Sequence, residues 1–340
     1  MTHKLNLFLT EDCNLHCKYC YVKKSKYSMT KEIALNSLHF FNSLKNDTAD
    51  KKILVLMGGE PLLNYKVVKD VIDYSSKMIN GRLCIAIPTN GTLLDKRKLD
   101  YFSKRKVIVG VSVDGNFDKN TNRVTSSDVN SYSLIQDKFP LLLKYDNIII
   151  RLTITPDFSK DLHDNFLFFH EKGFRRISFQ PATGYFWDDK SIENYIVNYK
   201  KIIEFSKKHK VDIRWFDSLV KLKRRLNHCG RIEYTITIDP VGDIYPCSFF
   251  TFYERGYRQN FKLGNVTEGT FNRNAEFVRD MQNFKVCDYL NVKCNKCEVS
   301  GACTRFCCCY NIRTRRLDKK IAASGYKLFS KIEKMAGLMN

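Results

Sequence analysis

Short apolar runs alternate with longer helical stretches through the first half of this 340-residue chain. The runs are rich in β-branched and aliphatic residues, as are strands buried on both faces of a parallel sheet. Their alternation with helical segments is typical of repeated βα units, which predicts an α/β fold: a partial (β/α)6, TIM-like barrel with ligands at the carboxyl ends of its strands. The expected strands are Leu5–Leu9, Ile53–Met57, Leu83–Ile87, Val107–Val113, Ile148–Ile154 and Arg176–Phe179, and expected helices include Thr30–Leu44, Lys66–Ile79 and Asp161–Lys172.

The alternation ends after Pro181, and the chain from Cys229 onward is rich in loops and closely spaced cysteines. A hairpin is expected around Pro240–Asp243, but the region has few apolar elements, so bound metal would have to organise it. The last residues place apolar side chains at helical spacing among Lys and Arg, which predicts a basic amphipathic helix. Its apolar stripe either packs on the barrel helices or docks a peptide or a membrane surface. The expected domains are residues 1–226, 227–312 and 313–340.

The formal net charge is +21, which indicates an acidic or polyanionic partner, or electrostatic steering. The longest apolar runs are far shorter than a bilayer-spanning helix, and the N-terminal residues lack the apolar core of a signal peptide. We therefore expect a cytoplasmic protein without a transmembrane segment.

The chain contains 13 cysteines, and without an export signal they indicate metal sites and not a disulfide framework. Three of them, Cys13, Cys17 and Cys20, cluster near the start, and most of the others lie between Cys229 and Cys309. Cys84 stands alone inside an expected strand and is interpreted as a small core residue.

The first cysteine cluster directly follows the first expected strand. Three thiolates on one tight loop can hold three irons of a four-iron, four-sulfur cluster and leave the fourth iron open. A zinc knuckle is the alternative, although no fourth ligand stands at zinc-finger spacing. The motif Cys13-x3-Cys17-x2-Cys20, with the aromatic Tyr19 before the last cysteine, resembles the radical SAM superfamily. The resemblance implies that S-adenosylmethionine binds the open iron and is cleaved reductively to a deoxyadenosyl radical.

Other short motifs stand where this resemblance would place them, each at the carboxyl end of an expected strand. The segment from Gly58 to Pro61 resembles the family's glycine-rich motif, and Ser112-x-Asp114 resembles the serine and aspartate beside the cofactor. Taken singly, each is also ordinary turn chemistry. Arg151 interrupts an apolar strand and needs an anion, either the cofactor carboxylate or a local salt bridge. The cofactor-binding residues that the resemblance implies are Tyr19, Gly58, Gly59, Glu60, Asn90, Ser112, Asp114, Arg123 and Arg151.

The cysteines from Cys229 onward resemble the SPASM domain, which carries two auxiliary [4Fe–4S] clusters. The resemblance implies Cys229, Cys247 and Cys307 as inner-cluster ligands, and Cys294, Cys297 and Cys303 as outer-cluster ligands. No cysteine follows Cys309, so Cys308 or Cys309 must complete the outer cluster; Cys308 is favoured because neighbours in an extended segment face opposite sides. Cys287 is either the fourth inner ligand or a free thiol. A zinc ribbon at the Cys294–Cys307 spacing is the alternative.

The resemblance implies an enzyme that abstracts hydrogen from a peptide or protein substrate. It would modify a ribosomally made peptide by crosslinking, epimerisation or oxidation, and a basic surface suits an acidic leader. Because little sequence precedes Leu5, we expect any leader-binding adaptor to be a separate protein. We also expect an external electron donor of the flavodoxin or ferredoxin kind.

Three alternative functions stay open. The first is anaerobic sulfatase maturation, in which a Cys or Ser becomes formylglycine; those enzymes usually have an aspartate where Ser248 follows Cys247 here. The second is a nucleic-acid-modifying radical enzyme, supported by the net charge and by the basic, aromatic stretch Tyr253–Arg258, which we expect at the surface. No nucleic-acid module is recognisable, so a nucleic-acid partner is not favoured. The third is a non-catalytic iron–sulfur or zinc scaffold.

Overall fold

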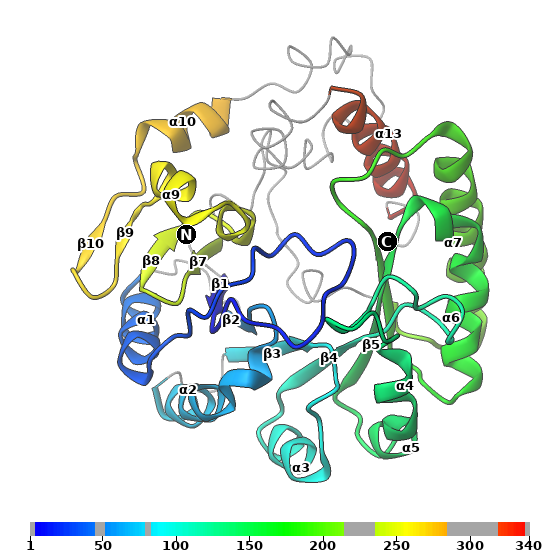
Figure 1. The fold of residues 1–340 in the computed structure, drawn as a ribbon, viewed down its shortest axis with the longest axis horizontal. Coiled ribbons are helices and arrows are strands. Elements are labelled where there is room, and N and C mark those ends of the chain that lie inside the picture. Colours follow the sequence, from blue (N-terminus) through cyan, green and yellow to red (C-terminus); the bar gives the residue numbers. More distant parts are fainter. Residues whose placement is uncertain (1–3, 45–51, 79–82, 214–234, 284–318, 337–340) are drawn as a thin grey trace. The chain divides into compact units, whose positions relative to one another are not determined.

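A computed structural model describes residues 4–44, 52–78, 83–213, 235–283 and 319–336 of the chain (Figure 1). The fold is α/β, with a large, mainly parallel sheet that does not close on itself, which confirms the expected partial barrel. The chain divides into two compact units. The first comprises residues 1–113, 120–150 and 231–278, and the second comprises residues 114–119, 151–230 and 279–340. The predicted domain boundaries near residues 226 and 312 lie outside the described residues.

Parallel strands in the order β7-β1-β2-β3-β4 form the centre of the first unit. They are β1 (Lys4–Phe8), β2 (Lys52–Met57), β3 (Leu83–Thr89), β4 (Ile108–Ser112) and β7 (Thr235–Ile238). Strand β1 pairs with β2 on one side and β7 on the other, so Leu5 stands between Leu54 and Ile236. These side chains are buried, as expected for a parallel sheet covered on both faces.

Short antiparallel strands extend the sheet beyond β7: β8 (Asp243–Tyr245), β9 (Gly264–Asn265) and β10 (Thr270–Phe271). The predicted hairpin around Pro240–Asp243 joins β7 to β8, and Gly242 adopts a left-handed φ of 88° there. The hairpin is as expected, whereas β9 and β10 are strands that the sequence did not predict. The strands are too short to show a period-two pattern in the sequence.

Helices α1 (Lys31–Ser43), α2 (Tyr65–Met78) and α3 (Lys96–Lys104) each follow a strand of the first unit. The first two match the predicted helices at these positions. Helix α1 begins where the Thr30 hydroxyl accepts a hydrogen bond from the Ile33 amide at 3.2 Å. The remaining short helices are α4 (Tyr132–Ile135), α5 (Phe139–Leu142), α9 (Arg255–Arg258), α10 (Glu276–Asn283), η1 (Pro61–Asn64), η2 (Gln136–Lys138), η3 (Pro156–Asp161), η5 (Ser248–Phe252) and η6 (Gln259–Phe261).

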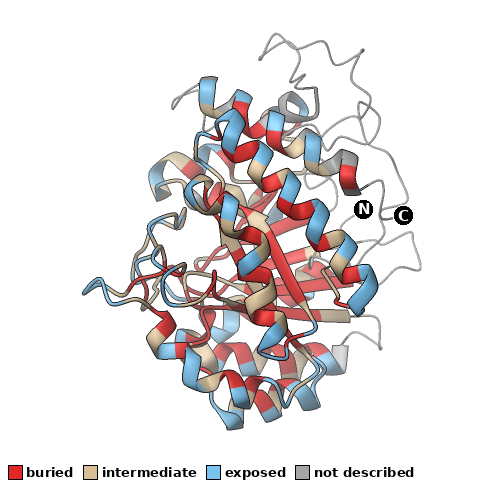
Figure 2. Cartoon of the chain, turned by 90° about the vertical axis from the view of Figure 1, so that its right-hand side faces the viewer, coloured by how far each residue is buried: buried red, intermediate tan, exposed pale blue. Residues whose placement is uncertain are grey.

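The second unit contains β6 (Ile177–Pro181) and most of β5 (Ile148–Ile154), which begins in the first unit. Its helices are α6 (Leu162–Glu171), α7 (Asp189–His209) and α13 (Lys319–Ala336), and α7 packs against both of the others. The helices have a buried stripe on one side and exposed residues on the other (Figure 2). No helix in the described part of the chain combines the length and the apolar character that crossing a bilayer requires.

Helix α13 lies in the C-terminal segment for which a basic amphipathic helix was expected. Leu328 on its apolar side is completely buried, and the Ser324 hydroxyl accepts a hydrogen bond from the Trp187 amide at 3.0 Å. Lys327 pairs with Asp189 at the start of α7. These contacts favour the packing alternative, in which the apolar stripe of α13 completes the core of the second unit.

We therefore expect Leu328→Ala to destabilise the protein by about 2–5 kcal/mol, because it leaves a cavity under α13. Lys331→Ala on the same helix is the control, since Lys331 is exposed and such surface changes cost less than about 0.5 kcal/mol. Denaturation midpoints of the two variants measure the difference. Equal midpoints would show that the stripe does not pack into a core.

Candidate functional site

The loop that carries Cys13, Cys17 and Cys20 leaves the carboxyl end of β1 and returns to it. We call residues 10–28 the cysteine loop. Its base is closed by hydrogen bonds from the Glu11 amide to the Tyr27 carbonyl, at 2.9 Å, and from the Met29 amide to the Leu9 carbonyl, at 2.8 Å. Cys13 and Cys17 are half-buried, and Cys20 is exposed.

The end of β2 approaches the cysteine loop more closely than a side chain would permit. The Gly59 amide donates to the Thr10 carbonyl at 2.8 Å, and the Glu60 amide donates to the Asp12 carbonyl at 2.9 Å. A Cβ on Gly58 would lie 2.4 Å from the Thr10 oxygen, and one on Gly59 would lie 2.3 Å from the Asp12 oxygen. Both positions must therefore be glycine, because the end of β2 and the loop backbone are too close for a Cβ atom. This close contact fixes the start of the loop.

The Glu60 carboxylate is completely buried and ties the end of β2 to the end of β3. It accepts hydrogen bonds from the Asn90 amide and the Thr89 hydroxyl, each at 2.7 Å, and from the Leu62 amide at 3.0 Å. Burial raises its pKa to about 7, against the opposing effect of these donors. The geometry gives Glu60 a supporting role, because its oxygens are occupied by the protein. A direct contact with the cofactor stays a prediction.

Asn90, at the carboxyl end of β3, reaches the cysteine loop. Its side-chain amide donates to Asn14 Oδ1 at 2.8 Å and lies 4.0 Å from Cys13 Sγ. The side-chain amide of Asn14 donates in turn to Thr92 Oγ1 at 2.8 Å. Asn14 was not singled out by the sequence; its position beside a cysteine was the only available signal.

Arg123 and Tyr19 come together on another side of the loop. The buried Arg123 guanidinium lies 5.3 Å from the Tyr19 ring centre, and its Nη1 lies 4.0 Å from Cys17 Sγ. The loop backbone is held here as well, because the His16 amide donates to the Val124 carbonyl at 2.6 Å. A positive charge beside a cysteine favours the thiolate form, which is the form that an iron ligand needs.

The loop offers three cysteine thiols, which is the donor set that a four-iron cluster takes. Among the residues described, no three His, Cys, Asp or Glu side chains converge on one ion. The thiolates of a four-iron cluster each bind a different iron, so they need not converge. Burial raises the pKa of the Cys13 thiol to about 11, so the thiol stays protonated at neutral pH unless a metal displaces the proton.

The other predicted cofactor contacts fall in both units. Ser112 ends β4 in the first unit and is half-buried. Asp114 and Arg151 belong to the second unit, where the buried Asp114 carboxylate accepts from the Thr153 amide at 2.8 Å. Arg151 is half-buried on β5, two residues before Thr153. Cofactor binding by these three residues stays a prediction.

Cys247 is buried two residues after the end of β8, immediately before η5. Its predicted role as an inner-cluster ligand stays a prediction. The other predicted auxiliary ligands lie outside the described residues: Cys229, Cys287, Cys294, Cys297, Cys303, Cys307, Cys308 and Cys309. Cys84 lies on β3 as expected, but it is half-buried, so the interpretation as a core residue is wrong in this respect.

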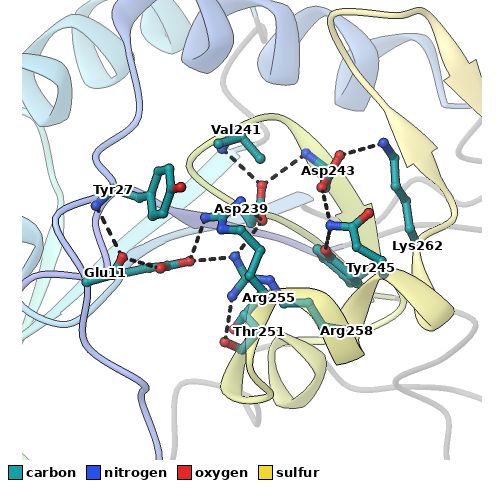
Figure 3. Close-up of polar contacts among 12 residues, drawn as sticks. Glu11, Tyr27, Asp239, Val241, Asp243, Tyr245, Thr251, Arg255, Arg258 and Lys262 are labelled. Carbon is teal, nitrogen blue, oxygen red and sulfur yellow. Dashed lines mark hydrogen bonds and ion pairs between the residues drawn. The ribbon is translucent and has the colours of Figure 1, made fainter.

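The stretch Tyr253–Arg258 does not present its arginines as a basic surface, which corrects the expectation. Arg258 is only 2% exposed, and its Nη2 lies 2.5 Å from Glu11 and 2.8 Å from Asp239 (Figure 3). Arg255 pairs with the same two carboxylates at 3.0 Å and 3.6 Å. No pattern in the sequence indicated this cluster, because its members are far apart along the chain.

The three-cysteine loop follows the first strand of a partial α/β barrel, and glycines and an asparagine from the next strands lie against it. This arrangement is typical of an enzyme class that uses an iron–sulfur cluster and S-adenosylmethionine. The chain carries a radical SAM domain: the family profile described as "Radical SAM superfamily" matches residues 7–167. A second profile, described as an iron–sulfur cluster-binding domain and named SPASM, matches residues 229–298. These domains imply [4Fe–4S] clusters and S-adenosylmethionine as cofactors.

Curated relatives match most of the chain. A cysteine-type anaerobic sulfatase-maturating enzyme of Clostridium perfringens is 25% identical over 87% of this chain and 85% of its own length. The antilisterial bacteriocin subtilosin biosynthesis protein AlbA of Bacillus subtilis is 26% identical over 87% of this chain and 65% of its own length.

Solved structures share the fold. The structure "Native anSMEcpe with bound AdoMet" covers 98% of this chain and 99% of its own, with a TM-score of 0.70 at 20% identity. Streptococcus suis SuiB bound to S-adenosylmethionine covers 94% of this chain and 75% of its own, with a TM-score of 0.61 at 13% identity.

The close approach at Gly59 makes a specific prediction. Gly59→Ala should displace the start of the cysteine loop and lower S-adenosylmethionine cleavage by roughly tenfold or more, as changes beside metal ligands do. Gly256→Ala is the matched control, because a Cβ there meets no atom within 4 Å. Deoxyadenosine formation by the two reconstituted proteins measures the effect, and equal rates would contradict the role given to this glycine.

The iron content tests the ligand assignment. We expect anaerobically reconstituted protein to hold about twelve irons, and a variant with Cys13, Cys17 and Cys20 all changed to Ala to hold about eight. The variant should also lose S-adenosylmethionine cleavage, because only this cluster has an open iron. Iron analysis and chromatography of deoxyadenosine check both points. Cleavage by the triple variant would rule out the assignment.

Proposed function

We propose that this radical SAM enzyme acts on a peptide or protein and modifies a ribosomally made peptide by crosslinking, epimerisation or oxidation. The observation that carries the proposal is the cysteine loop, held against the ends of β2 and β3 by Gly59 and Asn90. When bound, the cluster and S-adenosylmethionine supply a deoxyadenosyl radical that takes a hydrogen atom from the substrate. The reducing electron would come from an external flavodoxin or ferredoxin.

The protein's own residues would prepare the site for this chemistry. Cys13, Cys17 and Cys20 would hold the cluster, and Gly58 and Gly59 would keep the loop and the strand end in close contact. Asn90 would orient the loop through Asn14, as its 2.8 Å hydrogen bond supports. The positive charge of Arg123 would partly offset the negative charge of the Cys17 thiolate, and its guanidinium group would lie near the Tyr19 ring. Each of these groups lies in the first unit.

The peptide substrate is supported by two relatives. The relative AlbA is named for the biosynthesis of the bacteriocin subtilosin, and SuiB has been solved bound to the precursor peptide SuiA, with a TM-score of 0.56 to this chain. The net charge of +21 would attract an acidic leader. A separate leader-binding adaptor and a cytoplasmic setting belong to the same proposal.

Sulfatase maturation is the second candidate. It is favoured by the near-complete coverage of the C. perfringens sulfatase-maturating enzyme, 85% of which aligns with this chain. Ser248 speaks against it, because an aspartate usually follows the inner-cluster cysteine in such enzymes. Nucleic-acid modification loses support, since Arg258 is buried and Arg255 pairs with the carboxylates Glu11 and Asp239.

Two peptides separate the candidates. The reduced enzyme and S-adenosylmethionine are incubated with a short peptide encoded beside its gene, or with a peptide copied from the modified site of a cysteine-type sulfatase. We expect the first peptide to lose hydrogen or to take up solvent deuterium, as detected by mass spectrometry. Hydrazide labelling of the second peptide would instead show an aldehyde and establish sulfatase maturation. Absence of deoxyadenosine in both reactions would rule out both candidates and favour a scaffold.

A further inference from the structure

We propose that Arg258 is a positioning residue that couples the cysteine loop to the segment that begins at Cys247. The proposal rests on the assignment of Cys13, Cys17 and Cys20 as cluster ligands. It concerns the first unit alone, since all of the residues involved belong to it.

Arg258 joins three parts of the chain through one guanidinium group. Its Nη2 contacts the Glu11 carboxylate of the cysteine loop at 2.5 Å and the Asp239 carboxylate of the β7–β8 hairpin at 2.8 Å. Its Nη1 donates to the Thr251 carbonyl in η5 at 3.1 Å. Figure 3 shows these groups converging between the loop and the hairpin. A planar, multi-donor group is suited to such bridging, whereas lysine is not.

Arg255 completes the cluster and balances its charge. It pairs with Glu11 at 3.0 Å and with Asp239 at 3.6 Å, and its guanidinium lies 3.9 Å from the Tyr27 ring centre. Two carboxylates therefore face two guanidinium groups in a nearly solvent-free place, since Glu11 is 4% and Asp239 is 0% exposed. Removal of one partner leaves an uncompensated buried charge, which is the costly way to break such a cluster.

A second contact joins the part of the loop after Cys20 to the same segment. Tyr21, which directly follows Cys20, lies against Phe249, with ring centres 6.1 Å apart. Phe249 stands two residues after Cys247, and Glu11 stands two residues before Cys13. The cysteine loop is thus held before its first cysteine and after its last by residues that follow Cys247.

The segment itself is firmly held. Tyr253, Phe250 and Phe261 contact one another, with ring centres between 4.9 and 6.4 Å apart. Tyr257 and Phe277 add further ring contacts to Phe261. A change at Cys247 would therefore reach Glu11 and Tyr21 through packed groups, without the need for a mobile linker.

The test uses reconstituted full-length protein and the variants Arg258→Met and Arg258→Lys. Arg105→Met is the matched control, because it also removes one arginine from an ion pair, with Asp73 at 2.6 Å on the surface of the same unit. We expect Arg258→Met to change the electron paramagnetic resonance signal of the S-adenosylmethionine-bound cluster and to lower cleavage by roughly 10- to 100-fold. Arg258→Lys should lie between the parent and Arg258→Met, and Arg105→Met should match the parent.

Coupling is tested by a double-variant cycle. Cys247→Ser should alter the signal of the radical cluster in the parent protein and cause no further change in the Arg258→Met protein. Independent effects, or an Arg258→Met protein that matches Arg105→Met, would overturn the proposal. If Arg258→Met is insoluble, the isosteric Glu11→Gln takes its place in the cycle.

Thiol alkylation separates this proposal from the proposed function. Mass spectrometry follows the anaerobic labelling of Cys13, Cys17 and Cys20 by iodoacetamide, with Cys84 as the internal reference. Arg258→Met should raise labelling of the three loop thiols by roughly tenfold relative to Arg105→Met. A parent protein that cleaves no S-adenosylmethionine would disprove the proposed function, while the labelling would still decide the role of Arg258. Unchanged labelling would overturn the positioning role.

Discussion

The close contact between the end of β2 and the cysteine loop is the constraint on which the rest of the site depends. Parallel pairing brings the carboxyl ends of β1 and β2 to the same edge of the sheet. Gly58 and Gly59 then let the two backbones meet without an intervening side chain. Because β1 and β2 are adjacent in the sheet, Cys13 is held in a fixed position. Asn90 and Arg123 then contact a loop whose first residues are already fixed.

Polar groups hold this site in a setting where each unmet hydrogen bond would be costly. Glu60 is buried, yet it accepts from two amides and a hydroxyl. Glu11 is buried, yet it faces two guanidinium groups. Such arrangements add little net stability compared with apolar packing. Their hydrogen bonds and ion pairs are all formed in one geometry and are broken in most others. They therefore specify where the loop lies more than they stabilise the fold.

The sequence predicted the parts of the molecule that leave a local pattern. Buried parallel strands appear as apolar runs, so the strands from β1 to β6 were placed within a residue or two. The cysteine spacing identified the loop because its chemistry is local as well. Strands β9 and β10 were missed because strands of two residues have no period. The pairing of Glu11 with Arg258 was missed because a charged residue looks like a surface residue until its distant partner is known.

Strand β1 has neighbours on both sides, and one of them, β7, is made more than two hundred residues later. During synthesis the strand that carries the cysteine loop therefore has an open edge until Thr235–Ile238 have left the ribosome. Glu11 likewise has no cationic partner from this cluster until Arg255 and Arg258 have emerged. The loop can reach its final position and contacts only at a late stage of folding. A correctly shaped site for iron and sulfur is accordingly complete only after most of the chain has been synthesised, even though its first cysteine is the thirteenth residue.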